Sequence, residues 1–337
     1  MASLSFLLGM VPSTEKVETA DNTLRADYKA FKDYESSDEL KHYLELEKEV
    51  KSNDFKVRKK RMKKAEYKDS EEFKKETEYQ VLKKSEKVVW YYKTKKRYPF
   101  KEIERWNLTF NEKFNEGKLD RSKWMTQSFW GDLSMKEPYA MEDDKSLPTD
   151  GANIEFYDNK ARVVTKQENT DGLVWRSEQG FVREDFDFTS GMISTAKSFR
   201  QKYGVFNAKI KMAGGSVSQA LWMVSDTMLP HIDVARFENG KLYSNYFWGS
   251  SGSPRKSLSK TGGTKYADEY FIYTLEWTPN KLTWKINGKV FKTQTSGVPQ
   301  EEMSINFSSN LKKDASENGL PSAMEIDWVR VYKLKEN

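Results

Sequence analysis

Glycine and proline divide this chain of 337 residues into two regions that must fold differently. Neither residue occurs between Asp21 and Lys96, where Lys, Glu, Leu and Tyr are abundant. Because this stretch lacks the two strongest helix breakers and is rich in helix formers, it is predicted to be helical. After residue 105 glycine becomes frequent, and short runs such as FIYTLEWT and MEIDWVRVY alternate apolar with polar residues. That pattern predicts an antiparallel β-sandwich or jelly roll.

A serine recurs through the helical region, each time three residues before an apolar side chain. The four pairs are Ser37 and Leu40, Ser52 and Phe55, Ser70 and Phe73, and Ser85 and Val88. Serine before an acidic first turn is typical of a helix N-cap, and the apolar residue three positions later starts the buried face. The serines are 15, 18 and 15 residues apart, which predicts short antiparallel helices stacked as a small repeat domain.

These patterns predict a small all-α helical-repeat domain followed by a mainly β domain. We expect a tail over residues 1–20, the helical domain over 21–98, a linker over 99–105 and the β domain over 106–337. Pro99 ends the helical domain and opens an extended linker, because the residue before a proline disfavours helix. Within the β domain, the Asn-Gly-Lys sequences at 239–241 and 287–289 predict hairpin turns.

Composition excludes several classes of function. Cysteine is absent and only His42 and His231 could supply imidazole, so thiolate catalysis, disulfides and Cys- or His-rich metal sites are excluded. No apolar run approaches the roughly 20 residues of a membrane helix. The opening MASLSFLLGMVPST lacks the basic start and good cleavage context of a signal peptide. We interpret it as a docking tail or buried anchor, and expect an intracellular or particle-bound protein rather than a secreted one.

The net charge of +6 is concentrated in one segment. Residues 1–50 hold 6 basic and 11 acidic side chains, whereas residues 51–100 hold 18 and 8. The most basic run, KVRKKRMKK, contains Lys56, Arg58, Lys59, Lys60, Arg61, Lys63 and Lys64. One interpretation is a patch that binds nucleic acid or another acidic partner. The other is a solvated helix face balanced by the acidic first fifty residues, since no base-reading motif accompanies the run.

Five segments of the β region, in the same order, resemble glycoside hydrolase family 16, the laminarinase and lichenase type of jelly roll. They are LTFNEKFNEGKLDRSKW (108–124), TSGMISTAKSFRQKYGVFNAKIKMAGG (189–215), ALWMVSD (220–226), YTLEWTPNKLTWKINGKVF (273–291) and MEIDWVRVY (324–332). The resemblance spans nearly all of residues 106–334. It implies a concanavalin-like β-jelly-roll sandwich that binds or cleaves a polysaccharide.

The catalytic motif of that family is altered in this chain. Members carry Glu-x-Asp-x-x-Glu after the strand that ALWMVSD resembles, and retaining glycosidases need a nucleophile and an acid/base about 5–5.5 Å apart. Strand alternation with a one-residue bulge brings all three acids onto one face. Here the positions hold His231, Asp233 and Arg236, so we expect no catalytic residue. The three side chains form a structural ion pair, a reshaped ligand site or an unorthodox catalytic site.

Aromatic side chains around the motif are candidates for stacking on pyranose rings. Trp222 precedes the motif and Trp248 follows it, whereas Trp130 and Trp175 lie in segments that border the cleft in the family. Tyr246 stands where the family often has histidine. We predict these five as substrate-binding residues, with packing in the sandwich core as the alternative.

No cofactor or metal is expected, and the structural calcium of many family members is left open. Lys113 stands where the family has an acid, which disfavours calcium, whereas Asp327 matches the aspartate of the family's last strand.

Together these features predict a pseudoenzyme, a catalytically inactive family-16-like module that binds carbohydrate or serves a structural role. We expect the helical domain to make protein contacts or self-associate, as in a virion or other multi-subunit assembly. One alternative is an active β-glucan or galactan hydrolase or transglycosylase with a relocated acid. Another is a protein that binds nucleic acid or an acidic partner through the basic run.

Overall fold

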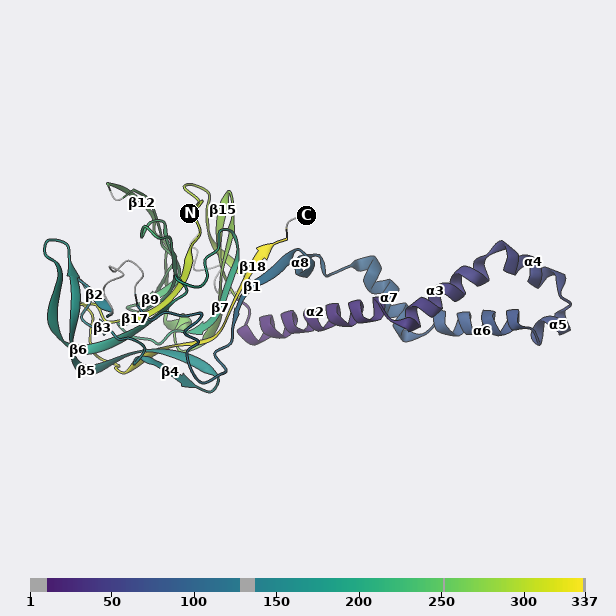
Figure 1. Cartoon of the computed structure of the whole chain (residues 1–337), viewed down its shortest axis with the longest axis horizontal. Coiled ribbons are helices and arrows are strands. Elements are labelled where there is room, and N and C mark those ends of the chain that lie inside the picture. Colours follow the sequence, from purple (N-terminus) through teal and green to yellow (C-terminus); the bar gives the residue numbers. More distant parts are fainter. Residues whose placement is uncertain (1–10, 128–136, 251, 336–337) are drawn as a thin grey trace. The chain divides into compact units, whose positions relative to one another are not determined.

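The computed structural model describes residues 11–127, 137–250 and 252–335, and the chain divides into two compact units (Figure 1). Glu18–Trp106 forms the helical unit. The described residues up to Val17 join the chain from Asn107 onward in the second unit, which is built of strands. Among the helices of these described ranges, none is long and apolar enough to cross a membrane.

Helices cover almost all of the first hundred described residues. They are α2 (Thr14–Glu35), α3 (Asp38–Lys51), α4 (Asn53–Arg61), α5 (Lys64–Lys68), α6 (Glu71–Lys83), α7 (Glu86–Arg97) and α8 (Lys101–Glu104). The predicted N-caps are confirmed: the side chains of Ser37, Ser52, Ser70 and Ser85 accept the backbone N–H three residues on, at 3.1 to 3.3 Å. The repeat architecture itself stays a prediction.

Two expected boundaries of the helical region differ from the structure. Helix α2 already begins at Thr14, within the stretch expected as a tail. After Pro99 the chain forms α8 rather than the extended linker expected over 99–105. The reason is apolar burial, since the Phe100 ring is fully buried against Tyr28 and Phe31, with centroids 5.3 and 5.4 Å apart. Tyr98 before Pro99 does leave the helix, at φ 38°, but a proline is compatible with a new helix directly after it, and burial of the Phe100 ring stabilises that turn.

The second unit is a mainly β sandwich, as predicted. Its strands are β1 (Trp106–Glu112), β2 (Tyr139–Met141), β3 (Leu147–Pro148), β4 (Ile154–Tyr157), β5 (Lys160–Arg176), β6 (Gly180–Ser194), β7 (Gly204–Lys211), β8 (Ser218–Val224), β9 (His231–Glu238), β10 (Lys241–Tyr243), β11 (Tyr246–Ser250), β12 (Ser253–Ser257), β13 (Lys260–Gly262), β14 (Tyr270–Thr278), β15 (Lys281–Ile286), β16 (Lys289–Gln294), β17 (Ser304–Asn310) and β18 (Ser322–Leu334). A 3₁₀ turn lies at Thr264–Tyr266.

Two antiparallel sheets carry the sandwich. One has the order β4-β5-β18-β7-β14-β15-β16. The other has the order β6-β17-β8-β9, and β9 also pairs with β10 and β11, which continue into β13 and β12. Strands β5 and β6 extend as a long hairpin, on which β2 and β3 pair in parallel. Figure 1 shows this hairpin projecting from one end of the sandwich.

The core lies between the two sheets. Strand β7 alternates buried and half-buried residues, the period expected of a strand with one face inward. Trp277 and Trp284 fill the centre and are almost completely buried. The Asn-Gly turns behave as the sequence predicts: Asn239 and Asn287 both adopt positive φ, followed by Gly240 and Gly288 in the same region, which is the backbone of the favoured two-residue hairpin turn.

The described start of the chain belongs to the sandwich rather than to the helical unit. Val11 packs against the sandwich core. The Asn287 side chain donates to the carbonyl of Pro12 at 2.9 Å and to the hydroxyl of Thr14 at 3.0 Å. Thr14 in turn donates to the backbone carbonyl of Tyr270. These bonds attach residues 11–14 to the start of β14 and to the turn between β15 and β16.

Strand β8 is buried on both faces, which locates the site. Leu221 and Met223 point into the core between the sheets. Trp222 and Val224 point the other way and pack with Met192 of β6 in a separate apolar cluster. A second buried face on this strand means that the outer side of the sheet is covered and hollowed rather than open to solvent.

Candidate functional site

A β-bulge in β9 gathers the three altered motif residues on one face, as the sequence predicts. In the pairing of β8 with β9, Trp222 lies opposite Asp233 and Leu221 opposite Ala235, so Val234 is the extra residue. The bulge changes the parity of the strand. It therefore brings Arg236 to the same face of the sheet as His231 and Asp233. Without the bulge, Arg236 would point to the opposite face.

Asp233 is the centre of a buried hydrogen-bonded cluster. Its Oδ1 accepts from Nη2 of Arg236 at 3.0 Å and lies 3.2 Å from Nε2 of His231. Its Oδ2 accepts from Nδ2 of Asn245 at 3.0 Å. The Asp233 side chain is 2% exposed, whereas those of Arg236 and His231 are 22% and 23% exposed. Both carboxylate oxygens are thus occupied, and the basic groups stand between Asp233 and solvent.

The protonation of the pair follows from this arrangement. Burial by itself raises the pKa of the Asp233 carboxyl, because a buried charge is poorly solvated. The charge of Arg236 and the hydrogen bonds from His231 and Arg236 outweigh burial and hold that pKa well below its usual range. Burial lowers the pKa of Arg236, but Asp233 more than offsets this and the net shift is upward. Asp233 therefore has no proton to donate at ordinary pH.

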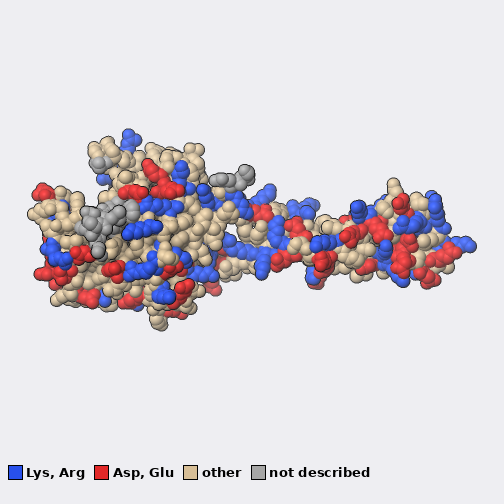
Figure 2. All heavy atoms as spheres, in the orientation of Figure 1, with Lys and Arg blue, Asp and Glu red and all other residues tan. Residues whose placement is uncertain are grey.

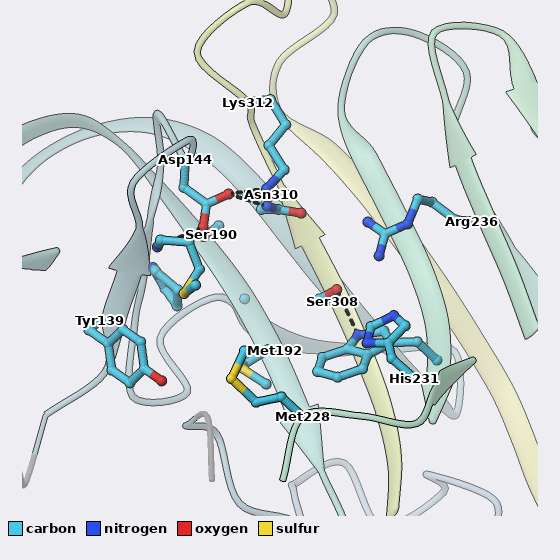
Figure 3. A pocket seen from close by; sticks show the side chains of 14 residues that line it. Tyr139, Asp144, Ser190, Met192, Met228, His231, Arg236, Ser308, Asn310 and Lys312 are labelled. Atoms are coloured by element: carbon cyan, nitrogen blue, oxygen red, sulfur yellow. Dashed lines mark hydrogen bonds and ion pairs between the residues drawn. The ribbon is translucent and has the colours of Figure 1, made fainter. Parts of the chain in front are cut away.

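The cluster opens onto a pocket of about 210 Å³ on the outer side of the β6-β17-β8-β9 sheet (Figure 3). Arg236 and His231 form one side, Trp222 and Met192 the floor, and Ser308 and Asn310 of β17 line it between them. A neighbouring pocket of about 660 Å³ shares Met228, His231 and Arg236 and adds Phe247. We refer to the two pockets together as the groove. Arg236 and His231 line both of its pockets.

Trp222 lines the first pocket of the groove, and its role in binding substrate stays a prediction. Its ring stacks on the His231 imidazole with centroids 5.0 Å apart and an interplanar angle of 14°. Its Nε1 donates to the Ser308 hydroxyl at 3.1 Å. The residue is 8% exposed, so only part of the ring is open to a ligand. Trp222 therefore both supports His231 and forms the apolar floor of the groove.

Trp248 and Tyr246 were predicted to bind substrate, but they face the core. Tyr246 is fully buried, stacks on Trp248 with centroids 4.7 Å apart, and donates its hydroxyl to the carbonyl of Gly297. The correction follows from strand alternation, since β11 directs Tyr246 and Trp248 inward and Phe247 outward. Phe247 lines the groove and packs edge-on against His231. The aromatic residue next to the predicted pair is the one that a ligand would meet.

The remaining predicted aromatics are not among the groove residues described above. Trp175 lies near the end of β5, paired with Phe181 of β6, and is 37% exposed. Trp130 lies outside the described residues. Tyr139 of β2 lines the groove and packs edge-on against Phe181, with centroids 5.0 Å apart. An aromatic contact therefore links the groove to the outer face of the β5–β6 hairpin.

Sequence reasoning missed a second polar cluster in the groove. The Oδ1 of Asp144 accepts from Asn310 at 2.5 Å and from Lys312 at 2.7 Å, and its Oδ2 accepts the N–H of Met141 at 2.9 Å. Lys312 also contacts Asp143 at 3.0 Å. A signal for part of it was present, because Ser304, Asn306 and Ser308 alternate with the apolar Ile305 and Phe307 along SINFSSN, which ends at Asn310. Nothing in the sequence pattern pairs them with Asp144.

The basic run of the helical unit is an exposed and partly compensated surface. All seven of its lysines and arginines are exposed. Arg58 lies 3.0 Å from Glu72, and Lys59 lies 2.6 Å from Glu76. Figure 2 shows acidic and basic side chains intermixed over this unit. The solvated-face interpretation fits these pairs, and the binding of nucleic acid or an acidic partner stays a hypothesis.

The residues tied to calcium by the resemblance do not fit a cation site. Asp327 forms an ion pair with Lys209, at 2.7 Å between Oδ2 and Nζ. Within the described ranges, no group of three or more His, Asp or Glu side chains could hold a metal ion. An ammonium group against the aspartate competes with a cation for the same oxygen, so no function is assigned to calcium here.

A two-sheet antiparallel sandwich with a groove on one outer face defines the class of the protein as a β-jelly roll. The chain belongs to the glycosyl hydrolases family 16, whose family model matches residues 148–330. It is 23% identical over 267 residues to glucan endo-1,3-beta-glucosidase A1 of Niallia circulans, and 29% identical over 167 residues to a beta-glucanase of Fibrobacter succinogenes. These matches cover 67% and 44% of this chain, but only 38% and 47% of the two relatives.

Solved structures show the same fold. The laminarinase catalytic domain of Thermotoga petrophila superposes with a TM-score of 0.53 at 18% identity, over 68% of this chain and 99% of that one. The kappa-carrageenase of Pseudoalteromonas carrageenovora, solved with an oligosaccharide of kappa-carrageenan, gives 0.54 at 21% identity, over 67% and 94%. At these identities the likeness establishes the sandwich fold alone. The chemistry of the groove depends on this chain's own residues.

Proposed function

We propose that this chain binds a glycan in its groove and has lost the hydrolysis carried out by its relatives. The observation that carries the proposal is the environment of Asp233. Family hydrolysis requires two carboxylates that reach the scissile bond from the groove. Here the flanking positions are a cation and an imidazole, and Asp233 lies behind them, ionised and with both oxygens occupied.

The other carboxylate of the groove does not supply the missing pair. Asp144 is 7% exposed at its side chain and accepts hydrogen bonds from Lys312, Asn310 and the Met141 amide. It lies across the pocket from Arg236 (Figure 3). An oxocarbenium-like transition state at the centre of the groove would therefore meet the guanidinium of Arg236, which disfavours it, instead of a carboxylate.

The remaining lining suits a sugar polymer. Trp222, Phe247 and Tyr139 offer aromatic surface, and the Ser308 hydroxyl and Asn310 amide offer hydrogen-bonding groups. A pyranose ring presents the matching features, an apolar C–H face and a rim of hydroxyls. A concave site that is mostly apolar with a few placed polar groups is the usual form of a ligand pocket.

The test is affinity electrophoresis of the full-length chain through gels containing laminarin, lichenan, xyloglucan, agarose or κ-carrageenan, with reducing ends measured in parallel. Retardation without new reducing ends is the expected result. Reducing ends that the Asp233→Asn variant abolishes would instead establish an active hydrolase with a relocated acid. Free migration in every gel would overturn the binding proposal.

A pair of tryptophan variants locates the binding. Trp222→Ala should weaken retardation, because it removes the floor of the groove, while Trp175→Ala should not, because that ring lies on the exposed end of the β5–β6 hairpin. Circular dichroism and the unfolding midpoint confirm that the Trp222 variant is folded. Loss of retardation in Trp175→Ala alone would place the glycan on the hairpin rather than in the groove.

For the helical unit we propose a role in protein association. Several apolar side chains are solvent-exposed there, among them Val81 at 65% and Val89 at 52%. Apolar groups left in water favour contacts with another protein surface. Light scattering of the full-length chain tests this role: a self-associated species that Val81→Ser with Val89→Ser dissociates is expected, and a monodisperse monomer at all concentrations would contradict self-association.

A further inference from the structure

The groove presents its cations to solvent and hides its carboxylates. Arg236, His231 and Lys312 are 22%, 23% and 21% exposed at their side chains. Asp233 and Asp144, the acids that accompany them, are 2% and 7% exposed. At Arg236 and His231 a ligand therefore meets mainly N–H donors, with the carboxylate of Asp233 behind them. Lys312 pairs with the buried Asp144 and also, at 3.0 Å, with Asp143, which is 71% exposed.

Arg236 is held in a fixed orientation. Its Nε and Nη2 donate to Asp233 at 3.3 and 3.0 Å, and its Nη1 donates to the hydroxyl of Ser218 at 3.0 Å. A guanidinium has five N–H groups, so these bonds leave donors on Nη1 and Nη2 for a ligand. Figure 3 shows the guanidinium directed into the pocket. A planar donor group oriented before binding loses little conformational freedom when it takes a ligand oxygen.

A ligand in either pocket of the groove can reach Arg236. Arg236 and His231 line both pockets, so a chain lying across the groove passes them wherever it is seated. Lys312, which follows β17, reaches the first of the two pockets. Arg236 and His231 of β9 and Lys312 after β17 line the same pocket, which distinguishes them from lysines scattered over an exposed surface.

We propose that the groove selects a glycan that carries an oxyanion, either a sulfate ester or a uronate carboxylate, and that Arg236 binds this group with His231 and Lys312 beside it. The inference rests on the proposed glycan binding and names its ligand class. Guanidinium forks match the two coplanar oxygens of a carboxylate or sulfate, with hydrogen bonds that are stronger because both partners are charged. The neutral sugar ring would lie over Trp222.

The experiment compares gels of agarose and κ-carrageenan, galactans of which only the second is sulfated, and adds polygalacturonate as the carboxylate polymer. The full-length chain is run beside Arg236→Lys and Lys281→Gln. The first variant keeps the net charge and loses the guanidinium fork. The second removes one positive charge at Lys281, an exposed residue at the start of β15 that does not line the groove. Lys312→Gln serves as an independent variant of the same pocket.

The expected result is stronger retardation by κ-carrageenan or polygalacturonate than by agarose, weakened about tenfold or more by Arg236→Lys and hardly changed by Lys281→Gln. Whichever anionic polymer is retained identifies the oxyanion. Equal retention in agarose overturns the inference but leaves glycan binding intact. Retention of the polyanions that both Arg236→Lys and Lys312→Gln leave unchanged shows non-specific charge attraction and overturns it too. Free migration everywhere removes both proposals.

If Arg236→Lys fails the circular dichroism check for folding, the Lys312→Gln variant and the comparison between polymers on the unaltered chain decide the question. Lys312→Gln leaves Asp144 with the donors Asn310 and Met141, so its effect on folding is expected to be smaller. Loss of κ-carrageenan or polygalacturonate retention in that variant supports the inference, and unchanged retention contradicts it.

Discussion

Two ion pairs with the same sequence spacing and nearly the same length lie in opposite environments in the two units. Asp38 and Lys41 on helix α3 are three residues apart and 2.9 Å from atom to atom, and Asp233 and Arg236 on strand β9 are three residues apart and 3.0 Å. The helical pair is 99% and 63% exposed, whereas the strand pair is 2% and 22% exposed. In water such a pair contributes little, because solvent and salt screen it. In the sandwich each charge depends on the other.

Burial makes the Asp233–Arg236 pair important for the site, whereas the exposed Asp38–Lys41 pair has little effect on its surroundings. An exposed pair can be broken with little loss, since water replaces the partner. A buried pair holds its members in place, and removing one leaves an uncompensated charge. The Asp233 cluster therefore fixes the Arg236 side chain in the groove, which no surface pair of the helical unit does for its members.

The largest expected effect is on the free energy of unfolding when one member of a pair is replaced. Arg236→Gln should lower the free energy of unfolding by about 3–5 kcal/mol, because Asp233 stays buried with only neutral donors and His231. Lys41→Gln should leave it unchanged within error. Urea unfolding followed by tryptophan fluorescence measures both. Similar effects in the two variants would mean that burial does not distinguish the pairs.

The next effect is on stability in acid. The pKa of the carboxyl is lowered in both Asp38 and Asp233, through the hydrogen bond with Lys41 in the first and mainly through Arg236 against burial in the second. A lowered folded-state pKa stabilises the protein above the unfolded value of about 3.9, and this is lost as the pH falls toward the folded value. Asp233 should therefore account for a progressive loss that begins below about pH 5, grows by at most about 1.4 kcal/mol per pH unit, and is complete only below the folded value.

Asp233→Asn tests this assignment. Unfolding free energies measured from pH 7 to pH 3 should fall less steeply in Asp233→Asn than in the unaltered protein, whatever the starting stability of the variant. Asp38→Asn should leave the slope nearly as it was, because its carboxyl is exposed in the folded state. An unchanged slope in Asp233→Asn would show that other carboxyls govern acid unfolding.

Two glycines with similar backbone conformation also lie in opposite environments, one packed closely and one open. Gly297 and Gly117 both adopt positive φ, 65° and 69°. A Cβ at Gly297 would lie 2.2 Å from Nε1 of Trp248, while one at Gly117 would meet nothing within 4 Å. Gly297→Ala should therefore lose about 1–3 kcal/mol more than Gly117→Ala, because both share the backbone strain and only one has the clash. Thermal unfolding of the two variants gives the difference.

The smallest effect is expected in the basic run. Lys60→Gln with Lys64→Gln removes two exposed charges from the helical unit. We expect the unfolding midpoint and the retardation by κ-carrageenan to stay as in the unaltered chain. Binding to duplex DNA, measured at two salt concentrations, should be weak in both proteins. Tight, salt-sensitive DNA binding lost in the variant would instead assign the run to nucleic acid.

Much of the fold and part of the site could be predicted because their causes are local. Each helix N-cap is a bond between a serine and an amide three residues away, and each Asn-Gly hairpin turn depends on two residues that tolerate positive φ. The bulge in β9 and the shared face of His231, Asp233 and Arg236 followed from strand parity together with the family pattern. These features need no knowledge of distant segments.

Only the tertiary structure decided what surrounds those residues. Asp144 meets Asn310 and Lys312 across more than half of the β unit's sequence, and no periodicity relates them. Whether Tyr246 or Phe247 faces the groove depends on the register of β11 against β9, since one residue of slip exchanges the two faces. Side-chain identity and spacing determined the elements and the altered motif. The burial of Asp233, and the exposure of the cations that cover it, came from how the sheets pack.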